Sequence, residues 1–122
     1  MTNEREIIYE SIVKAFSKNL IYFTNHLLDI FCTRINNNIF ATNMISSIST
    51  HVSKQKTLIF TIKSDCFIHL QTLNKIDYEF KQFINEYNKT IKNLFQNNIE
   101  GITLNIHTYT DELIFNEYYN IY

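Results

Sequence analysis

The chain of 122 residues contains one glycine and no proline. The glycine loops that bind dinucleotides and the P-loops that bind nucleotide phosphates need several backbone positions without a side chain. Both classes are therefore excluded. An all-β sandwich is also disfavoured, because its frequent tight turns draw on glycine and proline. The lack of glycine and proline therefore favours folds that contain few tight turns.

Length and composition predict one globular domain that spans residues 1–122. Hydrophobic residues make up 45% of the chain and charged residues 19%, which is typical of a folded protein. A chain of this length can bury a core without disulfides or metals. The net charge of −1 gives no basic excess for neutralising phosphates, which a free-standing nucleic-acid-binding protein usually has.

Residue usage indicates an AT-rich genome. The chain has 16 Asn and 20 Ile but only two Ala and two Arg, so residues with AT-rich codons outnumber those with GC-rich codons. This pattern suggests a virus-like or plasmid replicon, among other AT-rich sources. The many asparagines therefore need no chemical role.

Hydropathy and cysteine usage point to a cytoplasmic protein without membrane contact. No apolar run reaches 18 residues, and residues 1–10 carry charges of both signs instead of a signal-peptide core. Cys32 and Cys66 lack metal-binding spacing, so we expect two buried free thiols, with one disulfide as the alternative. No metal, cofactor or small-molecule substrate is expected.

Apolar residues recur at helical spacing in residues 4–35 and 75–96, which predicts two long amphipathic helices. Residues 36–38, all asparagine, are expected to end the first helix, because asparagine tolerates the left-handed conformation found there. Asn74 is expected to cap the start of the second. The apolar stripe of the second helix comprises Ile76, Phe80, Phe83, Ile84, Tyr87, Ile91, Leu94 and Phe95.

Three segments have the pattern of strands. Residues 57–65 and 102–109 alternate apolar and polar side chains, and residues 39–52 form a less regular stretch rich in Ile, Ser and Thr. Residues 66–70 extend the strand before them or form a short extra one. The tail, residues 111–122, fits either a strand or a helix. Together these elements predict an α+β fold: a small, mostly antiparallel sheet with the two long helices packed on one face.

The sequence carries no catalytic signature. Its four histidines lie too far apart along the chain to pair as metal ligands at helix or strand spacing. Asp65, Cys66 and His69 come nearest to a catalytic set, but on an extended chain Cys66 and His69 point to opposite faces. We therefore expect that the protein is not an enzyme. A turn that brings these three side chains together is the enzymatic alternative.

The aromatic tail is the strongest candidate for a partner interface. Residues 113–122 hold seven large apolar or aromatic side chains and one charge, Glu117. A patch of that size is seldom left in water by a soluble monomer. We expect Phe115 and at least one of Tyr118, Tyr119 and Tyr122 to pack against another protein chain, and the rest to lie on the chain's own core.

A second class of function is single-stranded nucleic-acid binding. Lys81, Lys89 and Lys92 lie on the polar face of the second predicted helix and could contact phosphates. A solvated helix face is the alternative interpretation of these lysines. Bases could stack on the tyrosines at positions 78, 109, 118 and 119.

Residues 23–96 resemble the small α-like assembly subunit of cellular RNA polymerases, the L-type subunit of archaea. The likeness rests on the order of Leu27-Leu28, Phe40-Ala41, His51, the strand LIFTIKSD and a long amphipathic helix. The family's His-Pro pair is missing here, and residues 102–109 and the tail have no counterpart in it.

The resemblance implies a non-catalytic subunit that dimerises through its helices and scaffolds a large polymerase subunit. More generally, the sequence predicts a protein-interaction subunit of a larger complex, whose partner is a large polymerase subunit or another complex member. The alternative is a viral or plasmid single-stranded nucleic-acid-binding protein.

Overall fold

A four-stranded sheet and two helices form two layers. The computed structural model of the chain describes residues 20–96 and 98–121. A first helix covers residues 20–35. The remaining elements are the π-helical turn η1 (Asn36–Phe40), β1 (Ile45–Val52), β2 (Thr57–Ser64), α2 (Leu70–Leu94), β3 (Gly101–His107) and β4 (Leu113–Asn120).

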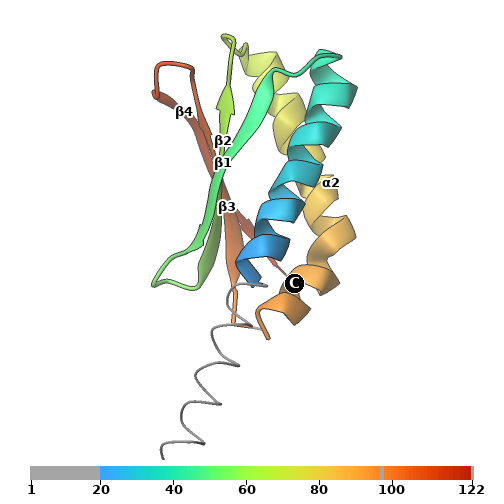
Figure 1. The fold of residues 1–122 in the computed structure, drawn as a ribbon, viewed down its shortest axis with the longest axis vertical. Coiled ribbons are helices and arrows are strands. Elements are labelled where there is room, and N and C mark those ends of the chain that lie inside the picture. The colour runs from blue at the N-terminus through green and yellow to red at the C-terminus, as the bar shows by residue number, and fades with distance from the viewer. Residues whose placement is uncertain (1–19, 97, 122) are drawn as a thin grey trace, which may run out of the picture.

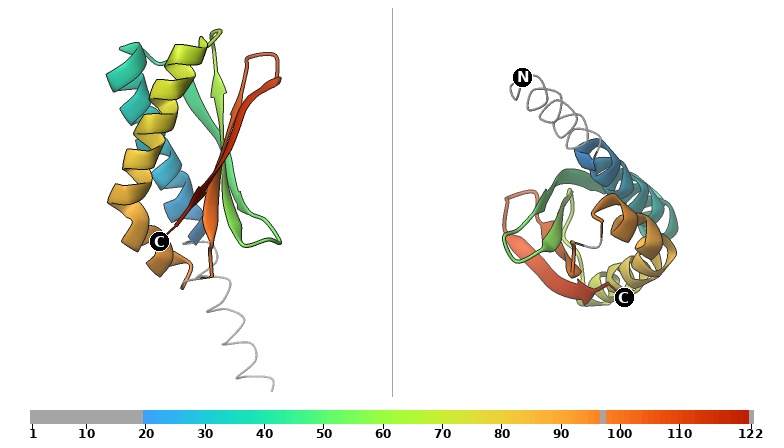
Figure 2. Two further views of the ribbon diagram at one scale, coloured as in Figure 1. Left: turned by 180° about the vertical axis from the view of Figure 1, so that it is seen from behind. Right: turned by 90° about the horizontal axis from the view of Figure 1, so that it is seen from below.

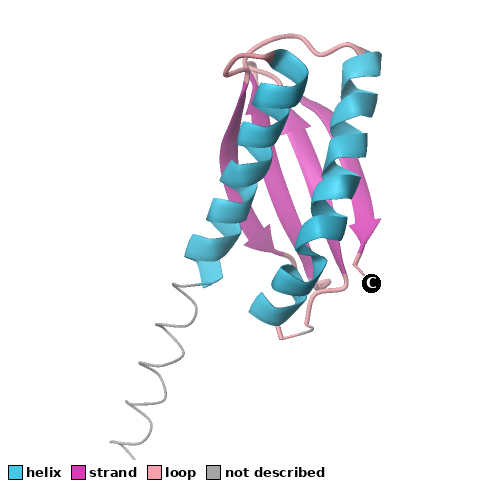
Figure 3. Cartoon of the chain, turned by 90° about the vertical axis from the view of Figure 1, so that its right-hand side faces the viewer, coloured by secondary structure: helices cyan, strands magenta, loops and turns pink. Residues whose placement is uncertain are grey.

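The sheet is mixed and has the strand order β1-β2-β3-β4. β1 with β2, and β3 with β4, form antiparallel hairpins, whereas the central pair β2 and β3 is parallel. Parallel neighbours need a crossover, and α2 provides it. Both helices lie on the same face of the sheet (Figures 1 and 3). The predicted α+β class is confirmed, but the central pair of the sheet is not antiparallel.

Phe80 of α2 lies at the centre of the core. Its ring centroid is 4.8 Å from that of Phe31 in the first helix, 6.0 Å from Phe60 in β2 and 4.9 Å from Tyr119 in β4. All three pairs are edge-to-face, the arrangement that the ring quadrupoles favour. Phe80 therefore links both helices to two strands of the sheet.

The second helix begins earlier than predicted. It starts at Leu70, after His69 in an extended conformation, so the expectation that Asn74 caps it is wrong. The backbone N–H of Leu73 donates to the carbonyl of His69 at 3.0 Å. Leu73 also packs against the core three residues before Ile76, which extends the apolar stripe by one turn.

Asparagine ends the first helix by a different mechanism from the one expected. The chain continues through η1 as far as Ala41, which adopts the left-handed conformation at φ 56°. Asn36 is buried. Its side-chain nitrogen donates to the carbonyl of Ile45 at 2.8 Å, and its oxygen accepts from the backbone N–H groups of Met44 and Ile45 at 3.0 and 2.8 Å. The amide thus pairs with the backbone at the start of β1, so the strand begins at Ile45 rather than at residue 39.

The other expected elements are found with small shifts. The first helix is present over residues 20–35, and residues 4–19 of that prediction lie outside the described residues. Residues 57–64 and 101–107 form strands as predicted, residues 66–70 form no further strand, and the tail forms β4. β1 contains an irregularity between Ser47 and Ser49, as its uneven sequence pattern suggested.

Replacing Phe80 by alanine should lower the free energy of unfolding by about 3–5 kcal/mol, because the cavity would face both helices and the sheet. Urea denaturation followed by circular dichroism measures this change. Tyr78→Ala on the same helix is the matched control, since Tyr78 is 61% exposed and its loss should change stability by less than about 0.5 kcal/mol. Equal losses for the two variants would contradict a core centred on Phe80.

Candidate functional site

No described element covers the face of the sheet that points away from the helices (Figures 1 and 2). Burial alternates along β2 and β3, so every second side chain of these strands points to that side. We call this surface the outer face. From the strand register it comprises Ser46, Ser49, His51, Thr57, Ile59, Thr61, Lys63, Gly101, Thr103, Asn105, His107, Asn116, Tyr118 and Asn120.

Tyr118 lies across the outer face above the only glycine of the chain. It pairs with Thr103 on β3, and a Cβ atom at Gly101 would overlap its ring. Gly101 has no positive φ, so the close approach of the ring, and not the backbone conformation, requires glycine here. Tyr118 remains 51% exposed. The hydroxyl end of the ring therefore lies close over the backbone of Gly101, and the side chain stays open to contact.

Tyr119, the next residue, points into the core. Its hydroxyl donates to the carboxylate of Asp77 on α2 at 2.5 Å, and only 8% of its surface is exposed. Burial, followed by the hydrogen bond and charge of Asp77, raises the pKa of the Tyr119 phenol well above its usual range, and Glu117 adds to the shift. The hydrogen bond between Tyr119 and Asp77 therefore joins β4 to α2.

The predicted partner interface is thus divided between two sides of β4. Tyr118 is exposed, Phe115 is half-buried and packed against the core, and Tyr119 is buried. Tyr122 lies outside the described residues. Leu113 at the start of β4 is also exposed, although the sequence analysis did not single it out. Strand alternation decides this division, because adjacent residues face opposite sides of the sheet.

One of the predicted lysines lies beside the predicted tyrosines. Lys81 and Asn85 of α2, with Tyr118, Tyr119 and Asn120 of β4, line a shallow hollow of about 370 Å³. The Lys81 ammonium forms an ion pair with Asp77 at 3.2 Å, so part of its charge is already balanced.

The other two candidate lysines do not line this hollow. Lys89 is exposed and Lys92 is half-buried on later turns of α2. The structure therefore brings one lysine to the aromatic strand and leaves two apart from it.

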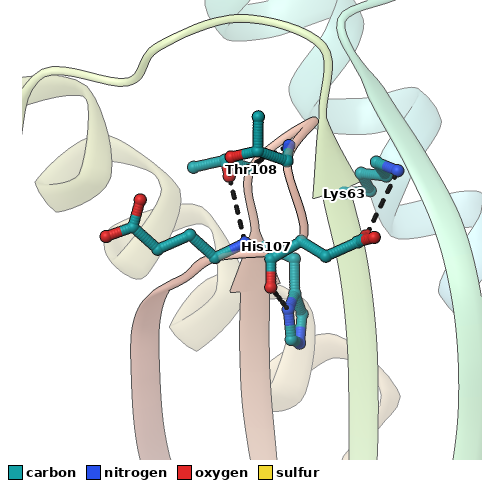
Figure 4. A network of polar contacts seen from close by, with 6 residues as sticks. Lys63, His107 and Thr108 are labelled. Atoms are coloured by element: carbon teal, nitrogen blue, oxygen red, sulfur yellow. Dashed lines mark hydrogen bonds and ion pairs between the residues drawn. The ribbon is translucent and has the colours of Figure 1, made fainter.

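A polar network closes the turn between β3 and β4 at one end of the outer face (Figure 4). The Lys63 ammonium lies 3.3 Å from the Asp111 carboxylate, and the His107 ring nitrogen Nδ1 lies 3.4 Å from the Asp111 carbonyl. The Thr108 hydroxyl accepts from the backbone N–H groups of Thr110 and Glu112. The network fixes the turn, but the exposed ion pair itself contributes at most about 1 kcal/mol.

The side chains of the enzymatic alternative contact different neighbours. The Cys66 sulfur lies 3.6 Å from the Ser64 hydroxyl, whereas the His69 ring packs edge-on against Phe67 with centroids 5.3 Å apart. No contact joins Asp65, Cys66 and His69 among the described residues.

Both cysteines are free thiols, so the disulfide alternative is not formed. Cys32 is buried, as predicted, and Cys66 is half-buried. Burial, with a smaller effect of Asp29, raises the pKa of the Cys32 thiol to about 12. Within residues 20–96 and 98–121, no group of three or more His, Cys, Asp or Glu side chains could hold a metal ion. The helices described here include none that is long and apolar enough to span a membrane.

Comparison with known proteins gives no relative. No protein-family model, curated protein or solved structure matches the chain. The resemblance to polymerase assembly subunits therefore stays a prediction.

Gly101→Ala should have opposite effects in two backgrounds. In the wild-type chain the new Cβ displaces the Tyr118 ring, so the free energy of unfolding should fall. In a Tyr118→Ala background the clash is gone, and alanine should stabilise by about 0.4–1 kcal/mol because it restricts the unfolded chain. A double-mutant cycle by urea denaturation measures the difference. The same sign in both backgrounds would show that the ring does not lie over Gly101.

Stability should fall above about pH 10 in a way that depends on Tyr119. Because the folded state raises the pKa of this phenol, the unfolded chain releases its proton first as the pH increases. The contribution of Tyr119 is therefore complete below the unfolded pKa and declines progressively as the pH rises from there toward the folded pKa. Unfolding free energies measured between pH 7 and pH 11 should decline less in Tyr119→Phe than in the wild type. Tyr78→Phe, which removes an exposed phenol, should follow the wild-type curve.

Proposed function

We propose that the protein is a non-catalytic interaction subunit that binds another protein chain through its outer face and the adjoining strand β4. The uncovered outer face, with the exposed Tyr118 ring close above Gly101, is the observation that carries this proposal. Ring, sheet and glycine form a pre-organised aromatic surface that needs little reordering on binding. Tyrosine is enriched at protein interfaces because it offers a large apolar area and a polar tip.

The rest of the outer face is suited to contact with a folded surface. Its central positions, Ile59, Thr61, Thr103 and Asn105, are half-buried and uncharged. Covering such side chains costs little desolvation compared with covering charged ones. Exposed Leu113 extends the apolar area along β4. β4 is also an edge strand, and edge strands can pair with an added strand of a partner.

The specific form of the proposal is an assembly subunit of a DNA-dependent RNA polymerase from an AT-rich virus-like or plasmid replicon, working in the cytoplasm. This form is supported by the resemblance of residues 23–96 to the α-like polymerase subunits. A large polymerase subunit would then occupy the interaction surface. The general proposal does not depend on this identification.

Affinity capture of the tagged chain from its native cells tests the proposal. A partner should be recovered in a fixed ratio with the wild-type chain and lost from Tyr118→Arg, because an arginine at this position would bury a charge in the interface. Tyr78→Arg is the matched control, since Tyr78 is exposed on α2 in the opposite layer. Equal recovery with both variants would contradict an interface on the outer face.

Two further readouts of the same capture separate the narrower alternatives. A large RNA polymerase subunit among the Tyr118-dependent proteins would support the polymerase form, and the absence of any transcription protein would contradict it. Nuclease treatment before capture removes associations bridged by nucleic acid. A partner that is lost on this treatment would favour the single-stranded nucleic-acid alternative, in which Lys81 and Tyr118 beside one hollow would contact the strand.

A further inference from the structure

We infer that a second copy of this chain docks on the outer face in an antiparallel orientation, so that the two sheets pack face to face about a two-fold axis. This inference rests on the proposed function, because it names the partner of the same surface. The outer face carries opposite charges at its two ends, and this placement favours a second copy as the partner.

The two hairpin turns of the sheet lie at opposite ends of the outer face. The β1–β2 turn, residues 53–56, precedes β2, whereas the β3–β4 turn, residues 108–112, follows β3. Since β2 and β3 are parallel, the start of one and the end of the other are at opposite ends of the sheet. Both turns bend away from the helices, toward the open side (Figures 1 and 2). Each turn can therefore contact a protein chain that lies against the outer face.

The turns carry charges of opposite sign. Lys54 and Lys56 are exposed in the first turn, and Asp111 and Glu112 are exposed in the second. Among the described residues Lys54, Lys56 and Glu112 have no ion-pair partner, and Lys63 balances only Asp111. The charged residues near the two turns do not reverse this difference in sign.

Two further carboxylates lie near the ends of the face. Exposed Glu100 donates its backbone N–H to the Lys56 carbonyl, so it offsets part of the basic end. Exposed Asp65, which follows β2, adds to the acidic end. One end of the outer face is therefore basic and the other acidic.

A two-fold axis makes this polarity self-complementary. The two turns lie at opposite ends of a diagonal across the outer face, because one joins β1 to β2 and the other joins β3 to β4. If the axis lies in the interface and perpendicular to this diagonal, the basic turn of each copy meets the acidic turn of the other. Each dimer then contains two identical charge contacts, one at each end. With the axis along the diagonal, like charges would meet at both ends. Charge complementarity therefore selects the antiparallel arrangement.

The central part of the outer face is large enough for sheet-on-sheet packing of moderate affinity. Strand spacing and rise per residue give the face an extent of about 450 Å² before the turns are added. This area is below the roughly 800 Å² per partner of a standard interface. The association is therefore a reversible one in which the turn charges contribute to both specificity and rate. Screening these charges with salt should weaken it.

Sedimentation equilibrium of the full chain over a range of protein concentrations tests the inference. The wild type should dimerise at low ionic strength and dissociate at 1 M salt, where charges more than about 3 Å apart are screened. Lys54→Glu and Glu112→Lys should each raise the dissociation constant at least about fivefold, because two symmetric contacts change from attraction to repulsion. Neither position has a positive φ, unlike Lys56 and Asp111, so both substitutions avoid backbone strain.

Mixing the two variants gives the decisive measurement. In a Lys54→Glu and Glu112→Lys heterodimer one contact is native and the other has both charges reversed, so an equimolar mixture should regain near wild-type affinity. Lys89→Glu makes the same charge change as Lys54→Glu at an exposed position of α2, so this variant should dimerise like the wild type.

Three results would overturn the inference. The first is a wild type that stays monomeric up to a protein concentration of about 1 mM. The second is a pair of variants that dimerise as well as the wild type, and the third is a mixture that fails to recover affinity. A monomeric wild type that still captures a different protein in a Tyr118-dependent way would overturn this inference but leave the proposed function standing.

Discussion

The parallel pairing of β2 with β3 is the constraint on which the rest of the structure depends. Parallel neighbours cannot be joined by a tight turn, so α2 must cross one face of the sheet. The first helix lies beside α2 on the same face, with Phe31 against Phe80 and Phe83. The other face is thereby left to the side chains of the strands. The same pairing sends the two hairpin turns to opposite ends, which separates the lysine turn from the acidic turn.

The sequence predicts best the elements whose pattern has one clear period. β2 and β3 alternate cleanly, and α2 carries an unbroken apolar stripe, so their positions follow within a few residues. The predicted boundaries of helices and strands are wrong where side chains act on the backbone. Asn36 could not be recognised as a partner for the start of β1, because its three hydrogen bonds join residues that come together only in the folded chain. Leu73 packs against the core and no proline or glycine lies nearby before it, so α2 starts one turn before Asn74.

The candidate site was predictable in composition but not in orientation. The aromatic tail pointed to β4, yet only the strand register sends Tyr118 to the outer face and Tyr119 to Asp77. A signal was present in the sequence: a lone glycine in a strand often marks a close approach of another group. Register also explains why the turn charges were missed. Lys54 and Glu112 acquire opposite positions only once β2 and β3 are known to be parallel.

The long crossover also affects how the molecule assembles. Each hairpin joins neighbouring parts of the chain, whereas the seam between β2 and β3 must close around residues 65–100. Loop-closure entropy makes local contacts cheaper to form than such distant ones. We therefore expect the two hairpins to form first and to meet last at the centre of the sheet. The contact between β2 and β3, the most deeply buried strands, should then be the slowest contact of the sheet to form.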